Sequence, residues 1–219
     1  MTNITRDVQR ILDHDVIIRR GLGREIINRK ALAEYLRKNG IKGSIDAIIS
    51  AIRRYETELK ADNSYATAEA IIKDAKLSTR TGIAIVAMTK DSSVQSNIPK
   101  LFTTIHYDRG EVLRVVQAEE SIKVIVDERN VAKVTDLMGQ NKIIKTERKL
   151  AEITMKLSPL SAKAPGVLAI LNNELAANDI NIVEAVSCVP ELLWFIDQKD
   201  LLKAHQTFLE LVGSLQAKK

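Results

Sequence analysis

Hydrophobic and polar positions in the first third of the chain recur with the period of amphipathic helices. Apolar residues keep helical spacing over residues 29–38 and again over residues 45–59, after an earlier short helix. Asn28 and Ser44 directly precede these two stretches and are residue types that cap helix N-termini. The pattern therefore predicts a helical domain over residues 1–62.

From Leu77 onward the pattern changes to the alternation typical of strands, and it is then repeated. A shift of the C-terminal part by 70 positions places Ile153 on Ile83 and superimposes the apolar positions of two strands and two helices. The order strand, helix, strand, strand, helix thus occurs twice. A further strand over residues 143–147 completes the first copy as βαββαβ, the ferredoxin-like arrangement.

The predicted fold class is α+β, with a helical domain followed by two ferredoxin-like βαββαβ modules. Residues 63–76 are expected to form a linker helix, residues 77–149 the first module and residues 150–219 the second. The second module ends in Gly-Ser-Leu-Gln-Ala-Lys-Lys, a poor strand sequence, so it lacks a clear fourth strand. Its open edge must then be covered by a helix, by the sister module or by another subunit, because unpaired edges promote association.

A short loop with Ala164-Pro165-Gly166 leads into an apolar helical stretch, and a strand-like run follows at residues 180–183. Proline fixes φ and glycine permits a close backbone approach, which suits a tight start to a helix. Residues 162–189 resemble the ligand-sensing half of an ACT domain, the regulatory module of many amino-acid-pathway enzymes, aspartokinases included. The whole order resembles archaeal proteins described as predicted regulators of amino-acid metabolism. The first module departs from the motif, since residues 94–96 are Val-Gln-Ser and its helix is expected to start later, with Asn97 as the cap.

The ACT resemblance implies a binding site for an amino acid or a related small carboxylate at an interface with a neighbouring module. The helix N-terminus would present free backbone N–H groups to the carboxylate. The implied ligand-binding residues are Ser158, Lys163, Ala164, Pro165, Gly166, Val167, Leu168, Asn181 and Ile182. The alternative is that Pro165-Gly166 only forms a strand-to-helix turn.

Positive charge is concentrated in the N-terminal part, where residues 1–63 contain 13 Lys and Arg but 9 Asp and Glu. Residues 31–55 resemble the helix-turn-helix of repressor-type proteins, which would place the helix from Ser44 in the major groove of DNA. The candidate nucleic-acid-binding residues are Arg29, Lys30, Lys42, Ser44, Arg53 and Arg54. The alternative is a solvated face or a surface that docks on another protein.

The sequence contains no motif that indicates an enzyme. It contains no glycine-rich phosphate loop, and its three histidines are not spaced as metal ligands. We therefore predict no catalytic residues, no metal and no cofactor. No apolar run approaches the roughly 18 residues of a membrane span, so no membrane partner and a cytoplasmic location are expected. The single cysteine, Cys188, lies in a strand-like run and is expected to be buried.

The sequence favours a non-enzymatic regulatory protein that binds a small-molecule effector, most simply an amino acid, and relays its binding to the N-terminal helices. A homo-oligomer, a dimer or larger, follows from the interface position of the implied site. The output would be DNA binding. The alternative is an allosteric subunit that docks on a metabolic enzyme, and a third reading is a structural oligomer whose ACT copies bind nothing.

Overall fold

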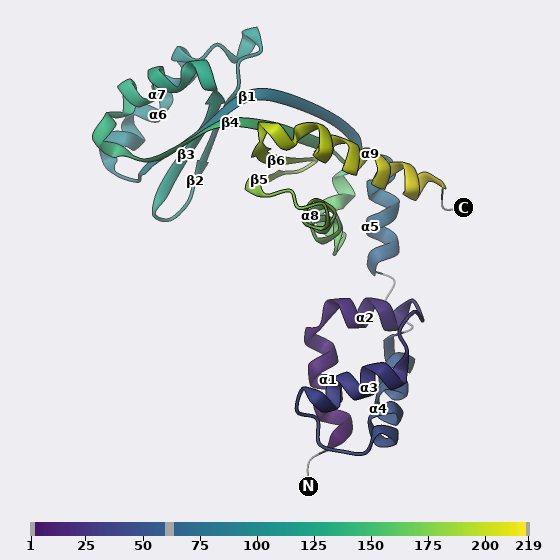
Figure 1. Ribbon diagram of the computed structural model, residues 1–219. Coiled ribbons are helices and arrows are strands. Elements are labelled where there is room, and N and C mark those ends of the chain that lie inside the picture. Colours follow the sequence, from purple (N-terminus) through teal and green to yellow (C-terminus); the bar gives the residue numbers. More distant parts are fainter. Residues whose placement is uncertain (1–2, 60–63, 218–219) are drawn as a thin grey trace. The chain divides into compact units, whose positions relative to one another are not determined.

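The computed structural model describes residues 3–59 and 64–217 of the chain. These belong to two compact units, Met1–Asn63 and Ser64–Lys219 (Figure 1). The polar stretch that begins at Ala61, where the sequence predicts a break between domains, lies partly outside the described residues. Each unit has its own hydrophobic core.

The described part of the first unit forms four helices, α1 (Ile4–His14), α2 (Val16–Gly23), α3 (Arg29–Lys38) and α4 (Ile45–Leu59). Their buried faces share one core, in which Leu12, Leu36 and Ile52 are fully enclosed. The Asn28 side chain accepts hydrogen bonds from the N–H groups of Lys30 and Ala31 at the start of α3. The Ser44 hydroxyl accepts one from the N–H of Ala47 at the start of α4. The bounds of α3 and α4 and both caps agree with the sequence pattern.

The second unit contains one six-stranded antiparallel sheet with the strand order β2-β3-β1-β4-β6-β5. Its strands are β1 (Lys76–Thr89), β2 (Leu113–Gln117), β3 (Ser121–Asp127), β4 (Ile143–Lys156), β5 (Ile182–Cys188) and β6 (Glu191–Asp197). Its helices are α5 (Ser64–Ile72), α6 (Ser92–Thr104), α7 (Val131–Met138), α8 (Val167–Ala177) and α9 (Leu201–Ala217). The α+β class predicted from the sequence is therefore correct for this unit.

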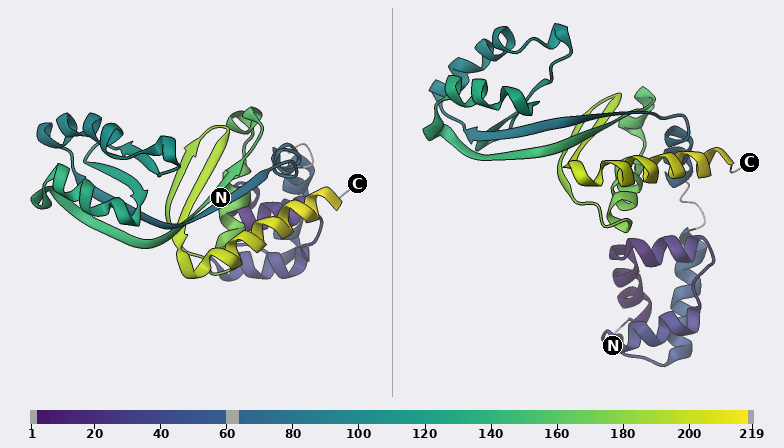
Figure 2. Two further views of the ribbon diagram at one scale, coloured as in Figure 1. Left: turned by 90° about the horizontal axis from the view of Figure 1, so that it is seen from above. Right: turned by 45° about the horizontal axis from the view of Figure 1, so that its top comes forward.

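The long strands β1 and β4 run through both halves of the sheet (Figure 2). Ile83–Thr89 of β1 pairs with β3 and with the first part of β4, which gives the first half the ferredoxin-like order β4-β1-β3-β2. Lys76–Arg80 pairs instead with Glu152–Lys156, so the second half has the same order, β1-β4-β6-β5. The missing fourth strand of the second module is thus Lys76–Arg80, although the sequence pattern assigned residues 77–80 to the first module. The edge expected to be open is filled. The C-terminal residues up to Ala217 belong to α9 instead.

Helix α5, expected to be a linker, is part of the second module. Ala68, Ile71 and Ile72 pack into the same core as the buried residues of α8, α9, β4 and β6. The ring of Trp194 in this core lies 5.1 Å from that of Phe208. The indole N–H of Trp194 donates to Oδ1 of Asn172 at 2.7 Å. The second module is consequently built from residues on both sides of the first.

A separate hydrophobic cluster lies on the helix-free face of the sheet and joins both halves. Alternation along β1 directs Ala84 and Val86 towards α6 and α7, and Ile83 and Ile85 to the opposite face. There they meet apolar residues from the other strands and from the segment just before β2, namely Val112, Ile125, Leu150, Leu193 and Phe195. Two ion pairs join the halves as well, Arg114 with Glu152 and Lys123 with Glu184. The sheet is therefore curled about this cluster.

Two local expectations are wrong. Helix α6 begins at Ser92 and is capped by Asp91, not by Asn97, so Pro99 lies inside it. The cost of an internal proline is offset by the Asp91 cap and by the burial of Val94 and Leu101. Cys188 is exposed because it ends β5, an edge strand. Among the described helices, none combines the length and apolar character needed to cross a membrane.

Candidate functional site

The loop between β4 and α8 contains most of the residues implied as ligand contacts. After Lys156 the chain forms a short 3-10 helix over Pro159–Lys163, and the Ser158 hydroxyl accepts from the N–H of Leu160 at 3.3 Å. Gly166 has φ of +94°, a left-handed conformation that residues with a Cβ rarely adopt, and it is the N-cap of α8. The predicted Pro-Gly turn into a helix is therefore present.

The first turn of α8 separates an apolar inner side from an accessible outer side. Val167 is 3% exposed and packs into the core of the second module. Leu168 is half exposed, and Lys163 and Pro165 are exposed next to it. No side chain caps the N-terminus of α8 in this part of the structure. The first N–H groups of a helix have no acceptor within it, so this end can receive an anionic group.

Asn181 and Ile182 lie at the opposite end of the same helix. The chain leaves α8 after Ala177 and reaches Ile182 at the start of β5, where Asn181 is exposed and Ile182 is half-buried. A helix of 11 residues is about 16 Å long, so these two residues cannot share a small ligand with Gly166 of the same module. The two sets could meet only across an interface. Strand β5 is an edge of the sheet, which makes such an interface geometrically accessible.

The equivalent loop of the first module is filled by its own side chains. Asp91 accepts hydrogen bonds from the N–H of Val94 at 2.9 Å and from the hydroxyl of Ser93 at 2.7 Å. Its other carboxylate oxygen lies 2.6 Å from Nζ of Lys142. The Lys142 contact and these hydrogen bonds hold the pKa of Asp91 well below its usual range. An internal carboxylate thus occupies the helix N-terminus, in agreement with the departure of this copy from the motif.

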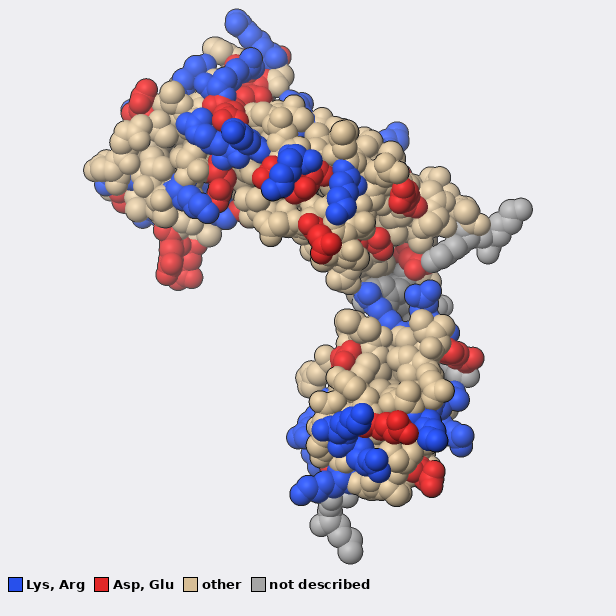
Figure 3. All heavy atoms as spheres, viewed as in Figure 1, with Lys and Arg blue, Asp and Glu red and all other residues tan. Residues whose placement is uncertain are grey.

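Two of the candidate nucleic-acid-binding residues of the first unit already contact other protein groups, and four are exposed. Nε of Arg29 lies 2.7 Å from Oε2 of Glu56, so its charge is already paired. Lys30, Lys42, Arg53 and Arg54 are exposed. Figure 3 shows Lys and Arg side chains gathered on this unit, with acidic groups among them. Ser44 is used as a helix cap, which leaves its hydroxyl less free for a base contact.

A cleft that the sequence does not predict lies beside β2. It has a volume of about 370 Å³ and is lined by Arg80, Phe102 and the four residues from Glu111 to Arg114. Arg80 of β1 pairs with Glu152 of β4, and Glu152 is also the ion-pair partner of Arg114, which brings the two arginines near each other. The only signal in the sequence is the presence of arginine in two strands, which is too common to identify a site. No group of three or more His, Cys, Asp or Glu that could hold a metal occurs in residues 3–59 and 64–217.

Comparison with known proteins finds likeness in fold only. No family model and no curated protein matches the sequence. The aspartate kinase of Clostridium acetobutylicum, an allosteric enzyme, matches 62% of this chain with 13% identity and a TM-score of 0.50, over 34% of its own length. The regulatory subunit of aspartate kinase from Thermus thermophilus matches 62% of this chain and 95% of its own, with 11% identity and a TM-score of 0.49. A C-terminal regulatory domain of aspartate kinase from Porphyromonas gingivalis matches 63% and 96%, with 13% identity and a TM-score of 0.46.

Proposed function

We propose that this protein is a non-enzymatic regulator that binds an amino acid or a related small carboxylate between ACT-like modules of two copies of the chain. The N-terminus of α8 would receive the carboxylate of the ligand. Asn181 and Ile182 of the neighbouring copy would complete the site. Binding would favour one packing of the copies over another, which is the physical requirement for regulation.

The observation that carries this proposal is the left-handed Gly166 at an uncapped start of α8, with Lys163 exposed beside it. Backbone N–H groups, the helix dipole and a nearby ammonium group together favour a carboxylate. The separation of Gly166 from Asn181 supports a site between copies, and hence a homo-oligomer. The likeness in fold to 34% of an allosteric aspartate kinase agrees with a regulatory role.

A screen of the twenty amino acids is expected to find one that raises the free energy of unfolding. A ligand bound only by the folded protein, at about 100 times its Kd, would add about 2.7 kcal/mol. Unfolding can be followed by the fluorescence of Trp194, the single tryptophan, which lies in the core against α8 and α9. Lys163→Gln is expected to weaken binding roughly two- to fivefold because the lost contact is solvent-exposed.

Lys203→Gln is the matched control, since Lys203 is exposed on α9 and its loss changes the net charge equally. The affinity of this variant should equal that of the unmodified protein. Failure of all twenty amino acids to shift the transition would sink the proposal and favour a structural oligomer. Equal weakening by both lysine variants would place the ligand elsewhere.

A second candidate output is DNA binding by the first unit, favoured by four exposed cations on or next to α3 and α4. The double change Arg53→Ala and Arg54→Ala is expected to weaken binding to non-specific duplex DNA. The slope of log K against log salt should fall in magnitude by about 2 if both arginines contact phosphates. Fluorescence anisotropy of labelled DNA across a salt series measures both quantities.

The control is Arg6→Ala with Arg10→Ala, which removes the same charge from exposed positions of α1. A similar loss in both double variants would indicate diffuse attraction without a defined surface. No retention on DNA at low salt, together with co-purification of a metabolic enzyme, would favour the alternative of an allosteric subunit docked through this unit.

A further inference from the structure

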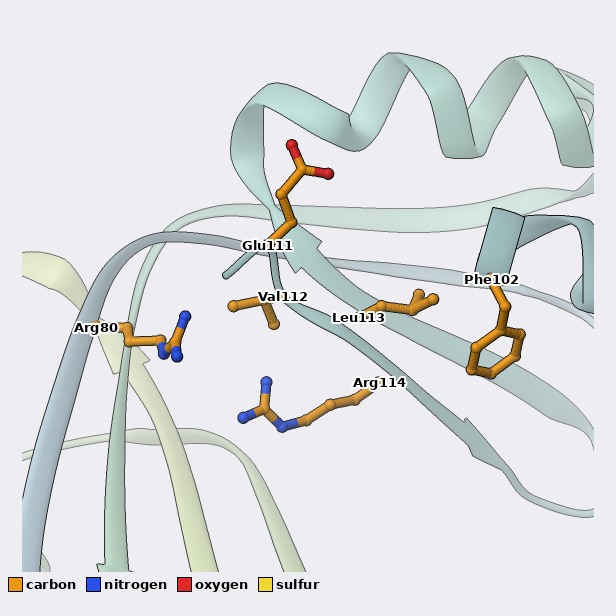
Figure 4. A pocket seen from close by; sticks show the side chains of 6 residues that line it. All are labelled: Arg80, Phe102, Glu111, Val112, Leu113 and Arg114. Atoms are coloured by element: carbon orange, nitrogen blue, oxygen red, sulfur yellow. The ribbon is translucent and has the colours of Figure 1, made fainter. Parts of the chain in front are cut away.

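The cleft beside β2 brings two guanidinium groups into one small space. Arg80 comes from β1 and Arg114 from β2, and both side chains extend into the space next to Val112 (Figure 4). Val112, Leu113 and Phe102 supply its apolar walls. Phe102 is 52% exposed, which is unusual for a phenylalanine with no partner to cover it. A volume of about 370 Å³ is in the range of small-molecule sites.

Arg114 is held in place by a buried carboxylate. Its Nη1 lies 3.0 Å from Oε2 of Glu152, and its Nη2 donates to Oε1 at 3.0 Å. The Glu152 side chain is 3% exposed, and its Oε1 also accepts from the hydroxyl of Thr154. One hydrogen bond and one close ionic contact thus hold the Arg114 guanidinium against Glu152. Its charge is thereby balanced, while its other N–H donors stay available for a ligand.

Arg80 is positioned without a balancing charge. Its Nη1 donates to the carbonyl oxygen of Gly110 at 3.0 Å, and the described residues place no carboxylate in ion-pair contact with it. Glu111 lines the cleft, but its carboxylate turns away from the arginines (Figure 4). It accepts from the N–H of His106 and pairs with Arg129 at 3.3 Å. The hydrogen bond from His106 lowers the pKa of Glu111, so it remains ionised and occupied. The cleft therefore has one uncompensated positive charge.

We propose that this cleft binds a small organic monocarboxylate with a short apolar body. The carboxylate would take the free donors of Arg80 and Arg114, since planar guanidinium groups match carboxylates in two-point contacts. The apolar body would lie on Val112 and Phe102. A single excess charge matches a monoanion better than a phosphate dianion. This site differs from the one proposed at Gly166 because it lies beside β2, where the two halves of the sheet meet.

A ligand here would contact the strand that both modules share. Arg80 is the last residue of β1 paired with the second half before the irregularity at Gly82, where φ is +67°. The N–H of Gly82 donates to Oε1 of Gln198, which belongs to the second module. A carboxylate on Arg80 would thus bind at the junction of the two halves, where its binding can affect the packing of both.

Isovalerate is a suitable probe, with isovaleramide as its uncharged analogue and inorganic phosphate as the alternative anion. In buffer free of other carboxylates and phosphate, NMR titration of the full chain should show saturable shifts at Gly110, Val112 and Leu113 with isovalerate. Isovaleramide should cause none. Arg80→Gln should weaken isovalerate roughly 10- to 100-fold, since it removes a charge-assisted contact.

Arg109→Gln is the matched control, because Arg109 is an exposed arginine near the cleft that does not line it. It should leave the isovalerate affinity unchanged, and so should Lys163→Gln, which separates this site from the one at Gly166. Phe102→Ala should weaken isovalerate but not acetate. The proposal is overturned if the amide shifts the same resonances equally, if phosphate binds more tightly than isovalerate, or if Arg80→Gln binds as the unmodified protein does.

Discussion

Replacing Ile72 with alanine is expected to lower the free energy of unfolding of residues 64–219 by about 2–5 kcal/mol. Ile72 is fully buried in the core that contains Trp194 and Phe208, although it precedes the first strand of the sheet. Removal of its branched side chain takes apolar contacts from this core and leaves a cavity. Urea unfolding followed by Trp194 fluorescence measures the effect in this unit alone, since the first unit contains no tryptophan.

The matched control is Ile26→Ala in the first unit, where Ile26 is 70% exposed. Its effect should stay within about 0.5 kcal/mol, and the Trp194 transition should not move. If Ile72→Ala also leaves that transition unchanged, α5 is a linker, as the sequence pattern suggests, and the second module does not extend to residues before β1.

Most of the fold could be predicted from local sequence pattern, but the pairing of Lys76–Arg80 could not. Helical spacing and caps locate α3 and α4, and the internal repeat identifies two ferredoxin-like copies. Lys76–Arg80 looks like the start of the first copy because it is continuous with Ile83–Thr89. Its partner is Glu152–Lys156, far along the chain. Periodicity specifies that a segment is a strand, but the partner of a strand depends on non-local packing.

The two candidate sites also differ in how far the sequence predicts them. Gly166 could be predicted because proline and glycine act on the backbone where they stand. The cleft at Arg80 could not, since its arginines come together only because Glu152 of β4 pairs with Arg80 and forms an ion pair with Arg114 of β2. The Asp91 cap was within reach of the sequence, as Asp-Ser-Ser before an apolar stretch is a helix start. The prediction placed the start of this helix at Asn97 because the apolar residues after it have helical spacing.

Replacing Arg114 with leucine is expected to destabilise residues 64–219 by about 2–3 kcal/mol. Glu152 would then remain buried without its counterion. The loss should fall below the roughly 3–5 kcal/mol of a fully enclosed pair, because the Arg114 side chain is 32% exposed and water screens part of the interaction. Urea unfolding monitored by Trp194 again provides the measurement.

The double variant Arg114→Leu with Glu152→Leu distinguishes attraction within the pair from the penalty of leaving one charge behind. Leucine at both positions would extend the apolar cluster formed by Leu150, Leu193 and Phe195, so the double variant should recover most of the stability lost by Arg114→Leu. Additive losses would mean that each residue acts through separate contacts and that the pair does not join the halves of the sheet. If the double variant regains stability but no longer binds isovalerate, the pair has a role in the cleft. Glu152 would then orient Arg114, and the ion pair would contribute more to binding than to folding.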